Sequence, residues 1–258
     1  MTWREDLTEW RTTAEVVVIG GGIIGASAAY HLARRGIRDV AIIEKDLLAQ
    51  GSTGLSVGGI RQQFSHAANI RLSQESVRVF EHFHDEFGVD IGFCRAGYLF
   101  LAQQEGTWRE FLSSIETQRQ LNVPVEVLNP DEIRRRWLYL NCDDIVGGTF
   151  GPDDGYADPY LAAMGFAAAA RKLGVHIEEL TRVTRILLSR DRVAGVETTR
   201  GPIASPVVVN AAGPWAAEVA AMAGLNLPVS PCRRQAFMTQ RFDLLPRPVP
   251  MIIDQDAL

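Results

Sequence analysis

The amino-acid sequence predicts an α/β fold with a parallel sheet, and two short stretches carry that prediction. "VVVI" at 16–19 is a β-branched run without polar alternation, which is typical of a strand buried on both faces. "DVAIIEKD" at 39–46 has the same character, and the alanine-rich segment between the two ends at Gly36, a residue suited to a left-handed helix cap. This order predicts a βαβ unit over residues 16–44 with a right-handed crossover.

Further helices and strands follow in a mixed order. Helical apolar spacing extends from His66 to Phe87, and Gly88 ends it. A helix start with a box-like cap is expected at Asn129-Pro130-Asp131-Glu132. Helices are also expected at 107–121 and 159–173, and strands at 97–103, 175–180, 183–188, 192–199 and 206–213, with turns at 189–191 and 200–202. The absence of a low-complexity linker indicates that a second domain is inserted into the first.

Composition and charge exclude several classes of function. The chain has 258 residues, 47% hydrophobic and 22% charged, which is ordinary for a globular protein. A net charge of −5 provides no basic field for nucleic acid, and residues 134–136, all arginine, are expected to form a solvated helix face. No integral membrane segment is expected, because Arg34, Arg35 and Glu44 interrupt the apolar N-terminal region.

The N-terminus and the cysteines bear on location. Residues 1–15, MTWREDLTEWRTTAE, lack the basic start and apolar core of a secretory signal and do not resemble a transit peptide. Cys94, Cys142 and Cys232 are odd in number and widely spaced, which argues against a disulfide framework or a zinc site and favours three buried thiols. We therefore expect a cytoplasmic protein without a bound metal.

A glycine motif lies directly between the first strand and its helix. Gly20, Gly22 and Gly25 form G-x-G-x-x-G, in which the first glycine makes the tight turn, the second lets the backbone approach a pyrophosphate and the third lets helix and strand pack closely. Unpaired N–H groups at the helix start then face the phosphates. Glu44 ends the next strand, where an acid accepts hydrogen bonds from ribose hydroxyls and disfavours a 2′-phosphate. The motif in this context predicts a dinucleotide site that does not select NADP.

The segment after the second strand favours FAD over NAD. An ordinary NAD domain continues with further β-α units, whereas this chain continues with "GSTGLSVGG" at 51–59. A cofactor with a ribityl chain and a flavin ring needs a second channel lined by backbone, which such a loop provides. Taken without its context, the same loop is equally compatible with a flexible surface segment.

Four motifs occur in the order of a known family. They are "VVVIGGGIIGASAAYHLARRG", "AIIEKDLLAQGSTGLSVGGIR", "GYADPYLAAMGFAAAARKLGVHI" and "VVVNAAGPWAAEVA". Together they resemble the FAD-dependent amine and amino-acid oxidoreductases of the D-amino-acid-oxidase (DAO) superfamily, in the branch that contains sarcosine oxidase, dimethylglycine dehydrogenase and glycine oxidase. "LSVGGIRQQFS" with "NIRLS" most resembles the "FAD-dependent oxidoreductase domain-containing" members of that branch.

The resemblance implies FAD as cofactor and a role for each matching position. Ile23 and Ile24 would lie at the pyrophosphate turn, beside the three glycines. The other implied contacts are Glu44 and Lys45 at the adenosine ribose, Ser52 and Thr53 at phosphate or ribityl oxygens, Gly58 and Gly59 close to the flavin, Val183 at the adenine through its backbone, and Ala212, Gly213 and Trp215 in a turn that closes over the cofactor. The family fold implied is a Rossmann-like FAD/NAD(P)-binding domain with an inserted α+β substrate domain.

Domain boundaries follow from the motifs. We expect the FAD-binding domain at 1–87 and 152–224, and the substrate domain at 88–151 and 225–258. Family members continue for well over a hundred residues beyond the last motif matched here, so both domains are expected to be incomplete in this chain. Alone, the chain is expected to leave a sheet edge unpaired and a flavin site open, to bind FAD weakly and to be inactive.

In the resembled family, the flavin takes a hydride equivalent from the carbon next to an amine. Water then hydrolyses the resulting imine. A substrate carboxylate then needs a cation, and Arg61 is the candidate catalytic residue in this chain. A structural arginine in a salt bridge is the alternative for the same side chain. The segment matching 153–166 holds a flavin-linking histidine in heterotetrameric sarcosine oxidase, and this chain has no histidine between His84 and His176, so a covalent flavin is not expected there.

Three functions are compatible with these motifs. The first is oxidation of a small secondary or N-methylated amine or amino acid, with oxygen or an electron-carrier protein as acceptor. The second is oxidation of a 2-hydroxy acid on the same scaffold, and the third is a non-catalytic flavoprotein that helps to assemble a respiratory complex. Other candidate groups are set aside: His66 as a helix-start histidine, His82 and His84 because they point to different sides of a helix, and Asp153-Asp154-Gly155 as a turn.

Overall fold

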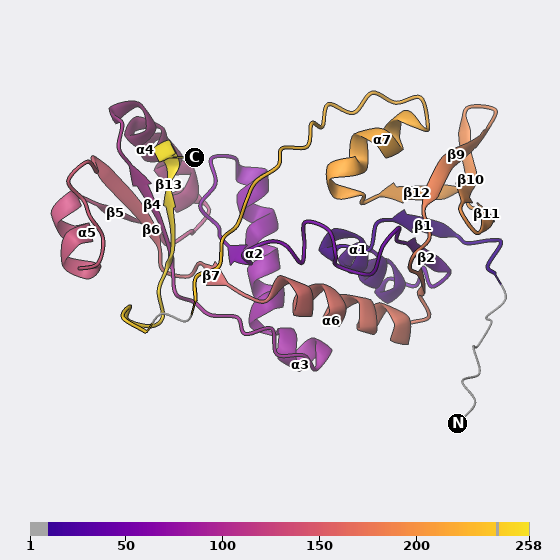
Figure 1. Cartoon of the computed structure of the whole chain (residues 1–258), viewed down its shortest axis with the longest axis horizontal. Helices are drawn as coiled ribbons and strands as arrows, with labels where there is room; N and C mark the ends of the chain where they lie inside the picture. Colours follow the sequence, from indigo (N-terminus) through magenta and orange to yellow (C-terminus); the bar gives the residue numbers. More distant parts are fainter. Residues whose placement is uncertain (1–9, 241–242, 258) are drawn as a thin grey trace. The chain divides into compact units, whose positions relative to one another are not determined.

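The computed structural model describes residues 10–240 and 243–257, and these residues form two compact units (Figure 1). The first unit contains 10–56 and 159–236, and the second contains 57–158 and 237–257. Residues 1–9 lie outside the described residues. They belong to the stretch 1–15, in which no targeting signal is expected.

A parallel sheet forms the centre of the first unit. Its strand order is β12-β1-β2-β8, and every neighbouring pair is parallel. The bounds are β1 Val16–Ile19, β2 Val40–Ile43, β8 His176–Glu178 and β12 Val207–Asn210. All residues of β1 and β2 are buried, which explains why neither strand shows polar alternation. Helix α1, Ile23–Arg34, joins the two strands, and the predicted βαβ unit is confirmed.

The two faces of this sheet pack against different elements. The first unit also contains an antiparallel sheet, β11-β10-β9, with β9 at Val183–Ser189, β10 at Arg192–Thr198 and β11 at Gly201–Ala204. Val17 and Ile43 share a core with Val196 and Ile203, so the antiparallel sheet covers one face of the parallel sheet. Helix α6, Pro159–Lys172, packs on α1 with small buried residues, and the Tyr30 and Phe166 rings lie 5.8 Å apart.

One predicted turn in this unit is shorter and begins earlier than expected. A turn was expected at residues 200–202 and lies at Thr199 and Arg200, whereas Gly201 begins β11 and Pro202 pairs with Glu197. A proline is tolerated there because β11 is an edge strand and needs no ladder N–H at that position. The unit ends with a 3-10 helix, η1 Gly213–Trp215, and helix α7, Ala216–Ala221.

The second unit is built on a mixed sheet with the order β13-β4-β6-β5. Its strands are β4 Tyr98–Ala102, β5 Glu126–Leu128, β6 Gly147–Gly151 and β13 Met251–Asp254, and a separate two-stranded antiparallel sheet joins β3 Gly59–Ile60 to β7 Gly155–Tyr156. Its helices are α2 Ala67–Glu81, α3 Phe83–Phe87, α4 Glu105–Gln120, α5 Pro130–Arg136 and the 3-10 helix η2 Gln255–Ala257. The predicted capping box is confirmed: Asn129 Oδ1 accepts from Glu132 N at 3.0 Å, and Glu132 Oε2 accepts from Asn129 N at 2.8 Å.

The helix predicted from His66 to Phe87 is divided in two. His82 leaves helical geometry, with φ −106° and ψ 15°, and separates α2 from α3. The break turns Phe83 into the core, where it is 1% exposed and its ring lies 4.3 Å from that of Phe87. The expected helix end at Gly88 is confirmed, and this glycine has a left-handed backbone with φ +70°.

The units differ from the expected domain boundaries at residues 57–87, 152–158 and 225–236. Residues 57–87 lie in the second unit because β3 pairs with β7 and α2 packs on α4. Residues 152–158 belong with them, whereas 225–236 remain with the first unit. The assignment of one unit to the cofactor and the other to the substrate stays a prediction.

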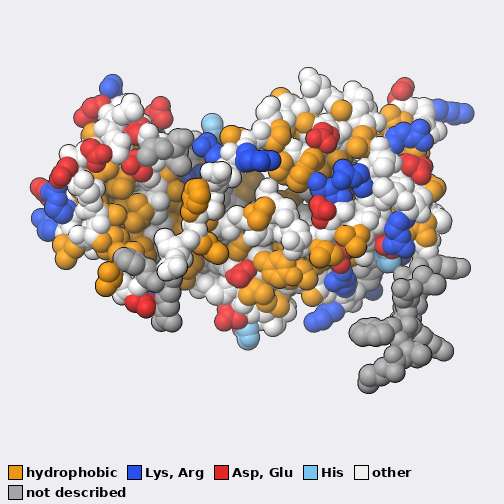
Figure 2. Space-filling view, viewed as in Figure 1, with side chains coloured by type: hydrophobic (Ala, Val, Ile, Leu, Met, Phe, Trp, Pro, Cys, Tyr) orange, Lys and Arg blue, Asp and Glu red, His pale blue; other side chains and the backbone are white. Residues whose placement is uncertain are grey.

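The cysteines and charges complete the description. Cys142 is buried, but Cys94 is half-buried and Cys232 is exposed, so the expectation of three buried thiols is wrong for two of them. Within 10–240 and 243–257 no helix is long and apolar enough to cross a membrane. On the face drawn in Figure 2, basic and acidic side chains are interspersed.

Candidate functional site

A cavity of about 770 Å³ lies in the first unit, where β1 and β2 end. It collects positions that are distant in sequence, from the glycine motif, the β2 end, the loop after it, β9 and the turn after β12. Of the residues predicted to bind the cofactor, the cavity is lined by Gly20, Gly22, Ile23, Ile24, Glu44, Lys45, Ser52, Thr53, Val183, Ala212, Gly213 and Trp215. Its position, at the carboxyl ends of parallel strands, is where α/β sheets bind ligands.

Each of the three motif glycines is required for a different structural reason. Gly20 has φ +112°, and a Cβ there would overlap the carbonyl of Ala211. A Cβ at Gly25 would overlap the carbonyl of Gly20, so Gly25 permits close packing of α1 on the glycine turn and does not line the cavity. Gly22 differs, since a Cβ there would lie 3.0 Å from Thr53 Oγ1. Gly22 therefore keeps space open beside a hydroxyl, which is the cradle that a diphosphate needs.

Glu44 and Thr53 hold the glycine turn in place. The Glu44 carboxylate accepts hydrogen bonds from Gly21 N at 2.6 Å and from Asp46 N at 2.9 Å. Thr53 Oγ1 accepts from Ile23 N, the first residue of α1, at 3.1 Å. A carboxylate has about four acceptor positions, so Glu44 retains capacity for a ribose hydroxyl while it fixes the turn. The first turn of α1 carries no acidic side chain, which leaves its positive end suited to an anion.

Lys45 and Trp215 meet at the rim of the cavity. Lys45 Nζ lies 3.2 Å from the centroid of the Trp215 ring, in a cation–π contact. Trp215 is 38% exposed, and Lys45 also lies near the Asp46 carboxylate at 4.0 Å. The two residues come from the β2 end and from η1, so this contact joins two motifs that the sequence placed at the same cofactor.

The sequence missed two residues that support this corner: Thr181, which lines the cavity, and Glu179, which lies in the segment between β8 and Thr181. Thr181 is fully buried, and its N–H donates to Glu44 O at 2.8 Å. Glu179 Oε1 accepts from Leu48 N at 2.7 Å. Both contacts arise because β8 pairs with β2 in parallel, which brings the segments after the two strands together. The sequence predicted a strand at 175–180 but not its pairing with β2, because no local pattern identifies the neighbour of a strand.

Gly58, Gly59 and Arg61 lie in the second unit and do not line this cavity. The Arg61 guanidinium lies over two aromatic rings, 4.5 Å from the Phe64 centroid and 5.1 Å from the Phe100 centroid. Across the part of the chain that the structure describes, no carboxylate forms an ion pair with Arg61. The alternative of a salt-bridged structural arginine therefore has no support, and the guanidinium is held in place by the two aromatic rings.

Asp154 is more than the turn residue that the sequence suggested. Its side chain is in the core of the second unit, at 1% exposure, and it accepts from Gln62 N at 2.8 Å and from Gln63 Nε2 at 3.2 Å. Burial raises the pKa of Asp154 to about 6, and the hydrogen bonds from Gln63 and Gln62 only partly oppose this increase. Asp154 thus anchors the segment that follows Arg61.

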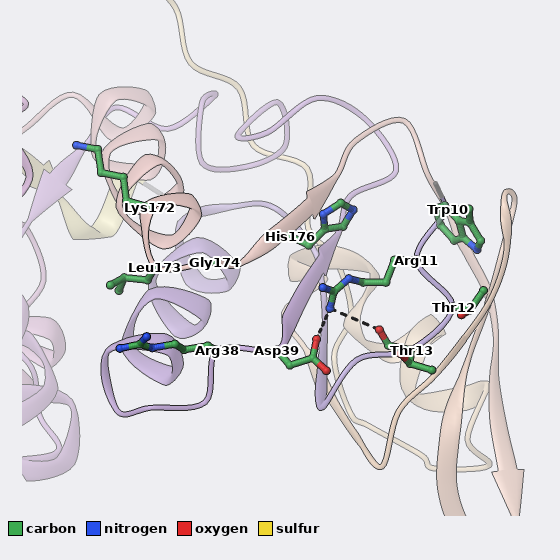
Figure 3. A pocket seen from close by; sticks show the side chains of 10 residues that line it. All are labelled: Trp10, Arg11, Thr12, Thr13, Arg38, Asp39, Lys172, Leu173, Gly174 and His176. Carbon is green, nitrogen blue, oxygen red and sulfur yellow. Dashed lines mark hydrogen bonds and ion pairs between the residues drawn. The ribbon is translucent and has the colours of Figure 1, made fainter. Parts of the chain in front are cut away.

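A second hollow of about 1000 Å³ lies elsewhere in the first unit, lined by Trp10–Thr13, Arg38, Asp39, Lys172–Gly174 and His176 (Figure 3). Arg11 pairs with Asp39, while Arg38 and Lys172 point away from that pair. The cationic groups therefore do not converge on one point. The hollow contains none of the predicted site residues, and among the described residues no group of three or more His, Cys, Asp or Glu is arranged to hold a metal ion.

The parallel sheet, the glycine turn and the acid at the end of β2 define a dinucleotide-binding α/β protein. Residues 15–257 match the family model described as "DAO: FAD dependent oxidoreductase". The chain belongs to this family, which confirms the resemblance drawn from the four motifs, the Rossmann-like fold class and the choice of FAD as the family's cofactor.

Relatives and solved structures are similar over most of this chain but extend beyond it. Dimethylglycine dehydrogenase, mitochondrial, of Rattus norvegicus is 35% identical over 253 residues, which cover 96% of this chain and 29% of that protein. FAD-dependent oxidoreductase domain-containing protein 1 of Xenopus laevis is 31% identical over 268 residues, covering 87% of this chain and 53% of that one. The L-proline dehydrogenase structure from P. horikoshii is 36% identical with a TM-score of 0.76, over 84% of this chain and 57% of that one.

Proposed function

We propose that this chain forms part of an FAD-dependent oxidoreductase that oxidises the C–N bond of a small secondary or N-methylated amino acid. Family membership supports the flavin chemistry, and two similar proteins, named for dimethylglycine and L-proline, act on amines of this class. The observation that carries the proposal is the cavity of the first unit, which gathers the glycine turn, the Glu44 carboxylate and the Thr53 hydroxyl.

The residues present fit a flavin dinucleotide. In this proposal, Gly22 and the start of α1 hold the diphosphate, Glu44 accepts from the adenosine ribose, and Lys45 with Trp215 borders the cofactor. Bound FAD would supply the redox chemistry. The contribution of the chain is to bind and orient both partners and to exclude water from them.

Arg61 binds the carboxylate of the amino acid in this proposal. Phe64 and Phe100 hold the guanidinium and remove water from its faces, so its N–H groups remain the part available to an anion. A bidentate guanidinium–carboxylate pair orients the substrate and selects amino acids over simple amines. The acceptor, oxygen or an electron-carrier protein, and a cytoplasmic location stay predictions.

Anaerobic flavin bleaching tests the proposal. The FAD-loaded protein is mixed with sarcosine, dimethylglycine, proline or 2-hydroxyglutarate, and absorbance of the oxidised flavin is followed. We expect bleaching by at least one of the three amines and none by the hydroxy acid. Bound FAD that no amine reduces would contradict the proposal, and bleaching by 2-hydroxyglutarate alone would replace it with hydroxy-acid oxidation.

A further inference from the structure

Two non-glycine residues of the first unit have a left-handed backbone next to the glycine turn. Ala49, in the loop after β2, has φ +60°, and Leu180, in the segment between β8 and β9, has φ +54°. This conformation costs free energy for a residue with a Cβ, and it persists only where surrounding contacts impose it. Residues of this kind gather at functional sites, so the contacts that hold the two segments indicate what the strain serves.

Hydrogen bonds join the two segments beyond the ends of their strands. Thr181 N donates to Glu44 O at 2.8 Å, and Leu180 N donates to Asp46 O at 3.0 Å. The next alternate residue, Leu48, donates its N–H to the Glu179 side chain, with 2.7 Å between Leu48 N and Glu179 Oε1. The Glu179 carboxylate therefore extends the contact between the segments to the start of the loop 47–54.

The glycine turn is in contact with the residues that Glu179 holds. A Cβ at Gly21 would lie 2.5 Å from Leu48 Cδ2, so the Leu48 side chain packs directly against Gly21. The strained residue that follows, Ala49, donates its N–H to Gly21 O at 3.1 Å. Leu48 and Ala49 are 3% and 2% exposed, so both are buried beneath the turn. A shift of the loop at this point would therefore displace the turn.

The same loop ends at the hydroxyl that faces the start of α1. Ala49 O accepts from Gly54 N at 2.9 Å, and a Cβ at Gly54 would overlap that carbonyl. This closed loop carries Thr53, whose Oγ1 accepts from Ile23 N at 3.1 Å. The position of Ala49 therefore determines where the Thr53 hydroxyl lies in the cavity.

The acceptor oxygen of Glu179 contributes more than its charge. Its other oxygen lies 3.7 Å from Arg171 Nη2, and the two side chains are 32% and 46% exposed. An ion pair that is this exposed contributes little to stability. The bond to Leu48 N differs, because it pairs a donor that belongs to a buried residue, and a buried donor without an acceptor is costly.

We propose that Glu179 is a positioning residue for the cofactor, because its carboxylate holds the loop 47–54 in the strained form that places Thr53 beside the diphosphate. This inference rests on the proposed function, in which the cavity of the first unit binds FAD. Glu179 does not line that cavity and acts through Leu48. A loop that is already formed binds without an ordering cost, so its release lowers affinity although every lining residue is retained.

Three variants separate the acceptor from the charge. Glu179→Ala removes both, Glu179→Gln keeps an acceptor oxygen, and Arg171→Met removes the ion pair but leaves the bond to Leu48. Calorimetry on the full chain measures the dissociation constants of FAD and of ADP, which has the diphosphate but no flavin. Hydrogen exchange of the ligand-free protein reports on the loop 47–54 and on the rest of the first unit.

We expect Glu179→Ala to weaken FAD and ADP by the same factor, about tenfold or more, and to accelerate exchange in the loop 47–54 by a similar factor. Glu179→Gln should restore both affinities to within about threefold of the wild type, and Arg171→Met should stay in the same range.

Four results would overturn the inference. The first is unchanged loop exchange in Glu179→Ala, and the second is an equal loss of affinity in Glu179→Gln and Glu179→Ala, because the charge would then matter and the acceptor would not. The third is a loss of FAD affinity without a loss of ADP affinity, which would place the effect at the flavin. The fourth is faster exchange throughout the first unit, which would make Glu179 a residue of general stability.

The outcome is separable from that of the proposed function. If Glu179→Ala releases the loop and weakens ADP but no amine bleaches the flavin, the positioning role stands and amine oxidation fails. If an amine bleaches the flavin and Glu179→Ala alters neither the loop nor the affinities, the reaction stands and the role of Glu179 fails.

Discussion

The Glu44 carboxylate accepts a hydrogen bond from the main-chain N–H of Gly21 at 2.6 Å, across the cavity corner where β1 and β2 end. The acid therefore acts on the glycine turn itself, in addition to any contact with a sugar. A charged acceptor on a backbone N–H forms a short and strong bond. In the proposed function, Glu44 therefore links the shape of the turn to the recognition of the dinucleotide.

The first prediction concerns Glu44→Gln. The amide retains one acceptor oxygen, but the charge-assisted bonds to Gly21 N and Asp46 N are weakened, and a ribose hydroxyl loses an anionic partner. We expect the dissociation constant of FAD to rise about 10- to 100-fold, as measured by quenching of flavin fluorescence. The control is Glu15→Gln, an exposed acid outside the cavity. Equal FAD affinity in Glu44→Gln and wild type would show that this carboxylate does not serve the cofactor.

Gly22→Ala should separate cofactor binding from folding. The added methyl group would lie 3.0 Å from Thr53 Oγ1, tight enough to displace that hydroxyl from its bond to Ile23 N. We expect FAD affinity to fall at least tenfold. The urea midpoint of the apo-protein should change little, because within the described residues no backbone atom apart from those of its chain neighbours lies within 4 Å of that methyl group.

Gly106→Ala is the matched control for this substitution. Gly106 lies in α4 with open space at its Cβ position, so the alanine should stabilise the protein by about 1 kcal/mol and leave FAD binding unchanged. A Gly22→Ala variant that binds FAD as tightly as the wild type would contradict the assignment of this glycine to the diphosphate.

The contrast between β1 and the segment after β3 shows how much the sequence could predict. The βαβ unit and the glycine turn follow from local chemistry, because an apolar run, three spaced glycines and an acid each restrict the backbone over a few residues. The family motifs then placed Lys45 and Trp215 at one cofactor, and the structure brings their side chains into contact.

Local sequence patterns could not predict contacts between segments that are distant in the chain. Nothing in residues 152–158 indicates that Asp154 is buried against Gln62 and Gln63, because the same residue types form solvated turns elsewhere. The edge strand β11 was missed for a similar reason, since Gly201 and Pro202 are turn formers that an edge position tolerates. The contacts of Thr181 and Glu179 likewise depend on which strand neighbours β2.

Arg61→Lys should weaken binding of the substrate although the charge is retained. An ammonium has no planar face to lie over the Phe64 and Phe100 rings and cannot form a bidentate pair with a carboxylate. We expect KM for the best amino-acid substrate to rise by about one to two orders of magnitude with a smaller change in kcat. Arg95→Lys is the control, an arginine of the same unit that pairs with Glu81. A KM that is unchanged in Arg61→Lys would exclude this guanidinium from the substrate site.

The last prediction concerns Asp154 and pH. Burial raises its pKa in the folded protein to about 6, whereas the unfolded chain has the ordinary value of 3.8. The folded state therefore binds this proton more tightly, so the contribution of Asp154 to the free energy of unfolding is greatest below about pH 4 and declines as pH rises towards 6. Above about pH 6 the contribution is constant. A difference of roughly two pKa units corresponds to about 3 kcal/mol.

Asp154→Asn removes the titrating group at that position, and urea unfolding of the apo-protein between pH 4 and pH 7 measures its effect. The wild type should lose stability relative to the variant by about 3 kcal/mol as pH rises from 4 to above 6, and the difference should then level off. Asp153→Asn, at the half-buried neighbouring carboxyl, should follow the wild-type profile to within about 1 kcal/mol. Parallel profiles for wild type and Asp154→Asn across this range would mean that Asp154 is not held in a desolvated site, because a desolvated carboxyl must couple folding to proton uptake.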